Sequence, residues 1–244
     1  MSSFNVKMAS VVVRVEPIFS RVERYCRDYL TDEPADFSVK ILPEDIAYER
    51  ERSDRESITE GLPVVDYPDD YLEELAVYRK ICEKMPDYGA FLFHGSAIAV
   101  EGQAFLFTAK SGTGKSTHTR LWRQYLGEKA VMVNDDKPLI RMTDSGPLVC
   151  GTPYCGKHGI GSNISVPLKA VCILTRAKKN SIRRVAPGEV RPLLLQQTYR
   201  PADPVQLMKT LDLMDRLTEW ASLYVLGCNM DISAAETAYN GMKD

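Results

Sequence analysis

Hydrophobic residues recur with two different periods along the chain, and this pattern predicts a mixture of strands and helices. Runs typical of strands lie at 10–17, 37–42, 90–94, 104–109, 131–133, 168–176 and 223–228. Spacing typical of amphipathic helices occupies 17–30, 68–85, 115–126, 204–223 and 232–242. Because strands and helices are interleaved, we expect an α/β protein rather than an all-helical or all-strand one.

Three segments carry more specific expectations. Residues 44–60 are densely charged, which predicts the solvated face of a helix or hairpin. The segments 168–176 and 181–186 are joined by Lys178-Lys179-Asn180 and are expected to pair as a hairpin. In the predicted helix over 204–223, we expect one stripe of residues to pack in the core, namely Leu207, Leu211, Met214, Leu217 and Trp220.

The composition indicates a soluble globular protein. Of the 244 residues, 44% are hydrophobic and 26% are charged. Apolar stretches fall well short of the roughly 20 residues that a membrane span needs, and the N-terminus lacks the pattern of a signal peptide. The sequence therefore predicts a cytoplasmic protein without a membrane partner.

Charge is distributed unevenly along the chain. Residues 1–88 carry 12 Lys and Arg against 20 Asp and Glu, whereas residues 89–244 carry 19 against 13. This change of sign predicts a small acidic α+β accessory unit over 1–88 and a separate domain over 89–244. The positive surplus of the second domain suits an anionic small ligand. It is too diffuse, and too free of interleaved aromatic residues, to predict a nucleic-acid partner.

Six cysteines are spread along the chain without the spacing of a disulfide framework. Cys150, Cys155, His158 and Cys172 leave a tetrahedral zinc site open as an alternative. Two observations speak against zinc. Cys172 lies in an apolar run, where a thiol behaves as a small hydrophobic residue, and no two cysteines have C-x-x-C spacing.

A glycine-rich segment lies between a predicted strand and a predicted helix. Residues 109–116 read AKSGTGKS and match the phosphate-binding pattern G-x-x-x-x-G-K-S/T, except that Ala109 replaces the first glycine. Backbone N–H groups of such a loop and the positive end of the helix bind phosphate oxygens. We therefore expect nucleotide to contact Ser111, Gly112, Thr113, Gly114, Lys115, Ser116 and Thr117.

A second element with acidic residues follows the loop. A predicted buried strand ends at Asn134 and continues into Asp135 and Asp136. In phosphate-loop proteins an acid at such a strand end holds Mg²⁺, and two acids in succession allow one to bind metal and the other to act as a base. An Asx turn or helix cap before Pro138 is the structural alternative.

A histidine completes the candidate set. His94 ends a predicted strand and is followed by Gly95. Together, His94-Gly95, the loop that ends at Ser116 and the Asp135-Asp136 pair resemble the catalytic domain of bacterial HPr kinase/phosphorylases. The resemblance covers roughly residues 90–185.

This resemblance implies a fold, a reaction and a set of roles. The implied fold is the one shared with ATP-dependent phosphoenolpyruvate carboxykinase, a mixed sheet around a P-loop. The implied reaction is transfer of the γ-phosphate of ATP to a hydroxyl with Mg²⁺. In the implied roles, Asp135 accepts the hydroxyl proton, Asp136 and Ser116 bind Mg²⁺, Lys115 contacts the phosphates and His94 orients the acidic pair.

The segment 150–185 resembles small HPr-kinase-related proteins that are encoded near peptide-modification or lasso-peptide genes. Some of those relatives phosphorylate a serine hydroxyl of a peptide, so we expect a peptide or small protein as the acceptor. The chain departs from HPr kinases at Thr117, where that family has an acidic residue. HPr-kinase relatives often assemble into rings, so the resemblance also allows a homo-oligomer.

Two other functions stay open. One is a carboxykinase-like enzyme, which would share the implied fold, and the other is a nucleotide-binding regulatory module without phosphate transfer. The roles of Lys157, Asn163, Arg176 and Arg200 also stay open.

Overall fold

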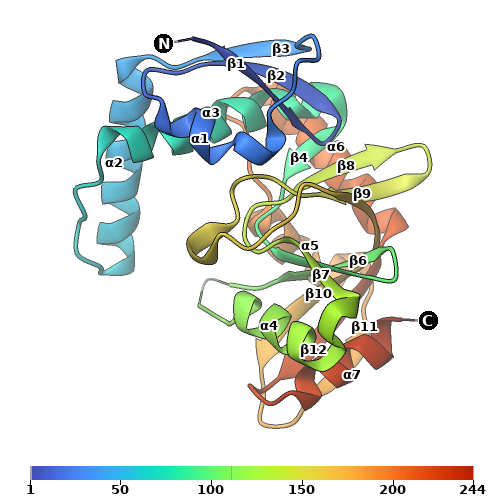
Figure 1. The fold of residues 1–244 in the computed structure, drawn as a ribbon. Coiled ribbons are helices and arrows are strands. Elements are labelled where there is room, and N and C mark those ends of the chain that lie inside the picture. Colours follow the sequence, from blue (N-terminus) through green and yellow to red (C-terminus); the bar gives the residue numbers. More distant parts are fainter. Residues whose placement is uncertain (1, 111, 244) are drawn as a thin grey trace. The chain divides into compact units, whose positions relative to one another are not determined.

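The computed structural model describes residues 2–110 and 112–243 of the chain (Figure 1). The chain divides into two compact units, Met1–Lys84 and Met85–Asp244. Each unit has its own sheet and helices. The mixture confirms the prediction of an α/β protein.

The first unit contains a small sheet and three α-helices. Its elements are β1 (Phe4–Met8), β2 (Val11–Glu16), α1 (Arg21–Tyr25), a 3₁₀ turn η1 (Arg27–Tyr29), β3 (Phe37–Lys40), α2 (Pro43–Glu60) and α3 (Asp69–Lys84). Strand β2 pairs antiparallel with β1 and parallel with β3. The two residues that join β1 to β2, Ala9 and Ser10, both have positive φ, as a tight hairpin turn requires.

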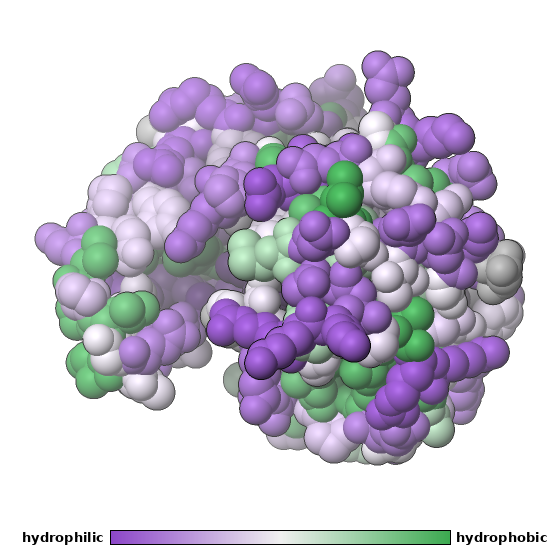
Figure 2. Space-filling model, turned by 90° about the horizontal axis from the view of Figure 1, so that it is seen from below, coloured by the Kyte–Doolittle hydropathy of each residue, from purple (hydrophilic) through white to green (hydrophobic). Residues whose placement is uncertain are grey.

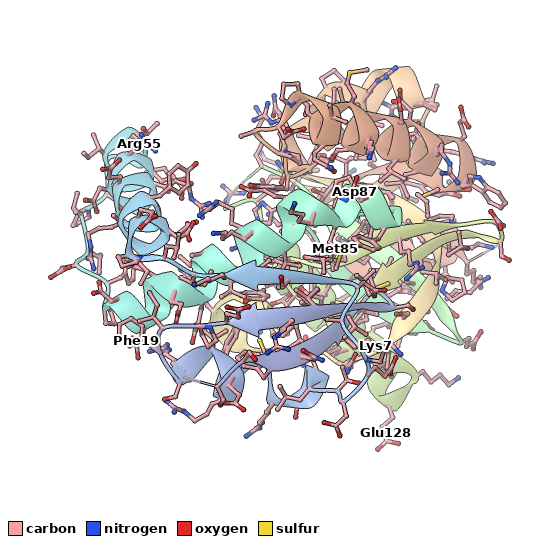
Figure 3. The ribbon with its side chains drawn as sticks, turned by 90° about the horizontal axis from the view of Figure 1, so that it is seen from above. Lys7, Phe19, Arg55, Met85, Asp87 and Glu128 are labelled. Carbon is pink, nitrogen blue, oxygen red and sulfur yellow. The ribbon has the colours of Figure 1, made fainter. Side chains whose placement is uncertain are left out.

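The charged segment 44–60 forms helix α2, most of which is exposed as expected, and ion pairs hold it against α3. Glu49 of α2 is only 1% exposed, and its carboxylate binds Arg79 of α3 at 2.6 Å and Arg52 at 3.1 Å. Glu73 of α3 is also buried, and it accepts hydrogen bonds from the backbone N–H of Ile18 and of Phe19, which is labelled in Figure 3. Buried carboxylates are stable when they are paired in this way.

Apolar side chains remain exposed at the end of α2 and in the segment that follows it. Figure 2 shows hydrophobic surface at this end of the helix. The exposed apolar residues of this segment are Ile58, Leu62, Val64 and Val65.

The second unit contains the remaining elements. Its strands are β4 (Ala90–Leu92), β5 (Ser96–Val100), β6 (Gln103–Thr108), β7 (Ala130–Asn134), β8 (Leu139–Thr143), β9 (Gly146–Cys150), β10 (Ser165–Arg176), β11 (Ser181–Arg184) and β12 (Ser222–Cys228). Its α-helices are α4 (Lys115–Leu126), α5 (Pro187–Gln197), α6 (Pro204–Trp220) and α7 (Ser233–Met242), and its 3₁₀ turns are η2 (Met85–Tyr88), η3 (Gly127–Lys129) and η4 (Gly156–His158).

The strands of the second unit form one mixed, curled sheet. Within the described residues it has nine strands, with the order β4-β8-β9-β10-β6-β5-β7, and β12 and β11 extend from β10. Strand β10 runs parallel to both β6 and β12. Strand β5 runs antiparallel to both β6 and β7.

Helices cover both faces of this sheet because its strands alternate hydrophobic residues between the two faces. In β6, Phe105 and Phe107 belong to a core cluster with Trp122 of α4. Leu106, between them in sequence, belongs to a second cluster with Leu217 of α6. The sheet is therefore buried on both sides, and α4 is held firmly against it.

The start of the second unit is fixed by contacts with α6. Met85 is fully buried, and the Asp87 carboxylate accepts hydrogen bonds from the side chains of Gln206 and Lys209 (Figure 3). These contacts explain why η2 belongs to the second unit and why the division falls after Lys84.

The structure corrects two expectations about this unit. The expected hairpin between 168–176 and 181–186 is wrong, because β12 lies between β10 and β11 and pairs with both. In α6, Met214 and Leu217 are buried as expected, but Trp220 is 55% exposed. Its ring packs on β9 at Gly146, where a β-carbon would lie 3.0 Å from the indole.

The structure also bears on membrane insertion. Among the described residues, no helix has the length and hydropathy needed to cross a bilayer.

Candidate functional site

The topology brings the candidate residues to one edge of the sheet. Because β6 and β7 both run antiparallel to β5, they end at the edge where β5 begins. Strand β10 is parallel to β6 and ends at this edge too. His94 precedes β5, Lys115 follows β6, and the acidic pair follows β7. Four segments that are distant in sequence therefore meet here.

The glycine loop, residues 109–116, connects β6 to α4. Gly112 has φ of 71° and Gly114 has φ of 116°, values that L side chains rarely adopt. Gly114 is the N-cap of α4. Because glycine has no side chain, it cannot cap the first N–H groups of the helix. Thr113, Ser116 and Thr117 are half-buried around it. Ser111, which the sequence includes in the nucleotide contacts, lies outside the described residues.

Lys115 begins α4 and points back toward the loop. Its Nζ donates a long hydrogen bond of 3.3 Å to the Ala109 carbonyl. Burial lowers the pKa of the ammonium below its usual value, while the charges of Asp136 and Asp135 act in the opposite direction. The lysine is thus a half-buried cation near two carboxylates.

An arginine from a different strand holds the loop. Arg176, the last residue of β10, donates from Nη2 to the Gly112 carbonyl at 2.6 Å. The guanidinium therefore lies at the glycine loop, although the two residues are 64 positions apart.

Asp136 forms a pair with His94. The His94 Nε2 lies 3.1 Å from Asp136 Oδ1, and both side chains are partly exposed. Burial acts to raise the pKa of Asp136, but the hydrogen bond with His94 and the charges of Lys137 and Lys115 outweigh it, so the pKa is lowered. Asp136 is therefore an ionised carboxylate that is partly open to solvent.

Asp135 has a different environment. Its side chain is buried, and its Oδ1 accepts a hydrogen bond of 2.6 Å from Ser96 of β5 and one of 3.3 Å from Thr119 of α4. The two neighbouring acids thus face different partners, as expected for adjacent residues at the end of a strand.

Asn134 shapes the turn that carries the acids. Its Oδ1 accepts hydrogen bonds from the backbone N–H of Asp136 at 2.9 Å and of Lys137 at 2.7 Å. Its Nδ2 donates to the backbone oxygen and the hydroxyl of Thr152. An Asx turn is therefore present before Pro138, as the structural alternative predicted, but the side chain of Asn134 forms it. The side chains of Asp135 and Asp136 are not used in this turn and make other contacts.

The glycine-rich segment 151–163 packs against the acids. A β-carbon at Gly156 would lie 2.9 Å from the β-carbon of Asp136, and the glycine has φ of 69°. Only glycine allows this close approach. The next two residues, Lys157 and His158, are exposed.

The structure gives no support to the zinc alternative. Cys172 is fully buried in β10, and burial raises its pKa together with that of Cys155. All six cysteines are free. Within residues 2–110 and 112–243, no three His, Cys, Asp or Glu side chains gather in a way that could hold a metal ion.

The donors at the sheet edge do fit Mg²⁺ bound together with phosphate. Mg²⁺ in such sites takes one or two carboxylates and phosphate oxygens rather than a cage made of protein side chains alone. Asp135, Asp136 and the Ser116 hydroxyl are oxygen ligands of this kind.

Sequence reasoning missed several residues of this edge. Ser96 and Thr119 carry no motif, and only their positions near His94 and Lys115 could have suggested them. Gln197 was missed as well, although its backbone oxygen accepts a hydrogen bond of 2.7 Å from the His94 N–H. Asn163 and Arg200 are exposed.

Comparison with known proteins identifies the family. The family model described as "SynChlorMet cassette protein ScmC" matches residues 71–199, which is more than half of the chain. The chain belongs to this family. The matched region contains the glycine loop, the acidic pair and His94.

Other comparisons are more distant. No curated protein sequence matches the chain significantly. Among solved structures, the Hpr(Ser) kinase/phosphatase from Coxiella burnetii is 13% identical, with a TM-score of 0.30, and the match covers 52% of this chain and 92% of that one.

Proposed function

We propose that this chain is an ATP-dependent kinase that uses Mg²⁺ and transfers the γ-phosphate to a serine hydroxyl of a peptide or small protein. One observation carries the proposal. The glycine loop with Lys115 and the His94–Asp136 pair lie at the same edge of the sheet, an arrangement that suits phosphate binding next to a base.

The loop supplies the features that bind phosphate. Its glycines adopt positive φ values, which are typical of loops that bind anions through backbone N–H groups, and the start of α4 adds partial positive charge. The Lys115 ammonium would replace its long bond to Ala109 with contacts to the β and γ phosphates. Arg176 supports the loop from β10 and adds a second cation.

The contacts favour one division of labour between the two acids, the reverse of that implied by the resemblance. Asp136 is accessible and paired with His94, so it suits the base that must touch the acceptor hydroxyl. Asp135 is buried and held by two hydroxyls, so it suits a rigid metal ligand together with Ser116. Mg²⁺, when bound, neutralises charge on the transferring phosphate.

In the proposed transfer one bond to phosphorus forms and one breaks. The acceptor oxygen forms a bond to the γ-phosphorus, and the bond from that phosphorus to the bridging oxygen of ADP breaks. The proton of the acceptor hydroxyl moves to the Asp136 carboxylate, which His94 orients. Lys157 and His158 follow Gly156, which packs against Asp136, and as exposed basic residues they are available for contacts to an incoming peptide.

The proposal is tested with ATP that carries label in the γ-phosphate, incubated with serine-containing peptides and with cell extract. We expect labelled peptide, and we expect Lys115→Ala to weaken nucleotide binding and abolish transfer because the ammonium neutralises phosphate charge. Lys110→Ala is the matched control, since Lys110 is an exposed lysine of the same loop. Its effect should be small.

Three outcomes count against the proposal. Free labelled phosphate without labelled acceptor would indicate hydrolysis rather than transfer. Nucleotide binding without any product would support the regulatory module instead. Unchanged nucleotide affinity and turnover in Lys115→Ala would remove the phosphate-loop assignment itself.

A further inference from the structure

Two buried hydroxyls surround the Asp135 carboxylate. Ser96 is fully buried and Thr119 is 1% exposed. Ser96 Oγ donates to Asp135 Oδ1 at 2.6 Å, Thr119 Oγ1 lies 3.3 Å from the same oxygen, and the two hydroxyls are 3.0 Å apart. These three side chains form a closed triangle of polar contacts inside the second unit.

The triangle joins three elements that are separated in sequence. Ser96 begins β5, Thr119 lies on α4, and Asp135 follows β7. Both hydroxyls meet the same carboxylate oxygen, Oδ1, and among the residues that the structure describes no hydrogen bond engages Oδ2, which can therefore accept a further ligand. A buried carboxylate with two fixed partners cannot turn freely about its side-chain bonds.

Thr119 connects the carboxylate to the glycine loop. It lies one helical turn after Lys115, and its hydroxyl is 3.4 Å from the Lys115 carbonyl and 3.3 Å from the Ser116 carbonyl. A movement of the first turn of α4 would therefore carry Thr119 with it and shift its contact with Asp135.

We propose that Ser96 and Thr119 are positioning residues, which hold the Asp135 carboxylate at a set distance and orientation from the Ser116 hydroxyl. This inference rests on the proposed function, in which Asp135 and Ser116 bind the same Mg²⁺. Residues that hydrogen-bond to a metal ligand commonly tune the affinity of the site for the metal, and their loss lowers that affinity by about 10- to 100-fold.

The test compares Thr119→Val with wild type in the full chain. Valine has nearly the shape of threonine and removes only the hydroxyl. We measure binding of ADP as a function of Mg²⁺ concentration, and binding of ADP in EDTA. We expect Thr119→Val to need about tenfold more Mg²⁺ for half-maximal binding, with unchanged binding in EDTA. Ser96→Ala should shift the Mg²⁺ requirement in the same direction.

Two further variants separate positioning from general stability. Thr119→Ser keeps the hydroxyl and should restore the wild-type Mg²⁺ requirement. Thr210→Val is the matched control, because Thr210 is also 1% exposed and its hydroxyl also lies close to a carbonyl of its own helix, that of Gln206 at 2.8 Å. It should leave the Mg²⁺ requirement unchanged even where it lowers the melting temperature.

Crystal structures of wild type and Thr119→Val without nucleotide give a second readout. We expect the Asp135 carboxylate to turn in the variant. An unchanged Mg²⁺ requirement in folded Thr119→Val overturns the proposal. If wild type shows no Mg²⁺-dependent ADP binding, the proposed function fails. The crystal structures then test the positioning role of Thr119 separately: a turned Asp135 carboxylate in the variant supports that role, and an unmoved one overturns it.

Discussion

Asp135 and Asp136 are neighbours in sequence, yet their side chains have different hydrogen-bond partners. Two hydroxyls contact the carboxylate of Asp135, whereas His94 pairs with that of Asp136, and the charge of Lys115 acts on both. A base needs access to the acceptor hydroxyl, while a metal ligand needs a fixed oxygen. The two environments therefore separate two roles that residue type alone does not distinguish.

Substitution of each acid tests this separation. Asp136→Asn should reduce transfer by about 10²- to 10⁴-fold and leave Mg²⁺-ADP binding nearly intact, because it removes the base. Asp135→Asn should instead raise the Mg²⁺ concentration needed for binding. Transfer rates and Mg²⁺ titrations of both variants provide the measurement. Exchanged phenotypes would restore the roles implied by the resemblance, and full transfer by both variants would contradict the mechanism.

A buried histidine should make stability depend on pH. Burial lowers the pKa of His118 to about 4, and its Nε2 accepts a hydrogen bond of 3.1 Å from the Trp122 indole. The folded state keeps the ring neutral, whereas the unfolded state takes up a proton below its ordinary pKa of about 6.5. His118 therefore does not change the free energy of unfolding above about pH 6.5. As the pH is lowered from there toward 4, His118 lowers that free energy by about 3 kcal/mol in total.

Urea unfolding between pH 4 and 7 measures this loss. His118→Gln cannot titrate in this range, so its free energy of unfolding should vary less with pH than that of wild type. His158→Gln is the matched control because His158 is exposed. If the two variants show the same pH dependence, His118 is not the group responsible.

At the scale of elements, the β1–β2 hairpin carries strain that one substitution should relieve. Ser10 has φ of 59° in the turn, a conformation that costs an L residue about 1–2 kcal/mol and glycine little. After the greater entropy loss of glycine is subtracted, Ser10→Gly should stabilise the chain by about 0.5–1 kcal/mol. The midpoint of urea unfolding tests this. Ser38→Gly, in the extended backbone of β3, should lower stability instead.

Local signals explain which elements could be predicted. Helix α4 begins at Lys115 and ends at Leu126, as predicted, because glycines precede and follow it and its hydrophobic residues have helical spacing. The pairing of β11 with β12 could not be predicted. Those strands are joined by two helices, and only their packing against β10 determines which neighbour each one takes.

At the scale of the whole molecule, the two units should be separable for nucleotide binding. The candidate phosphate-binding residues all belong to the unit that begins at Met85. A chain that starts at Met85 should therefore fold and bind ADP. Circular dichroism and ADP titration test this, and the full chain with Lys115→Ala is the negative control. A folded truncated chain without ADP binding would contradict the independence of the unit.

The first unit is acidic, with 12 Lys and Arg against 19 Asp and Glu over residues 1–84. We therefore expect it to favour an acceptor with basic residues. The cytoplasmic location, the acceptor and a homo-oligomer remain predictions.

Residues that are close along the chain suffice to predict the α/β class, the glycine loop with its helix and the presence of two acids after a strand. The folded chain is needed to see which acid contacts His94 and which one lies against Ser96 and Thr119. Those contacts join segments 16 to 42 residues apart, and the pairing of β5 with β6 and β7 creates them. Hydrophobic periodicity specifies strands but not their neighbours, so the geometry of the candidate site exists only once the sheet has formed.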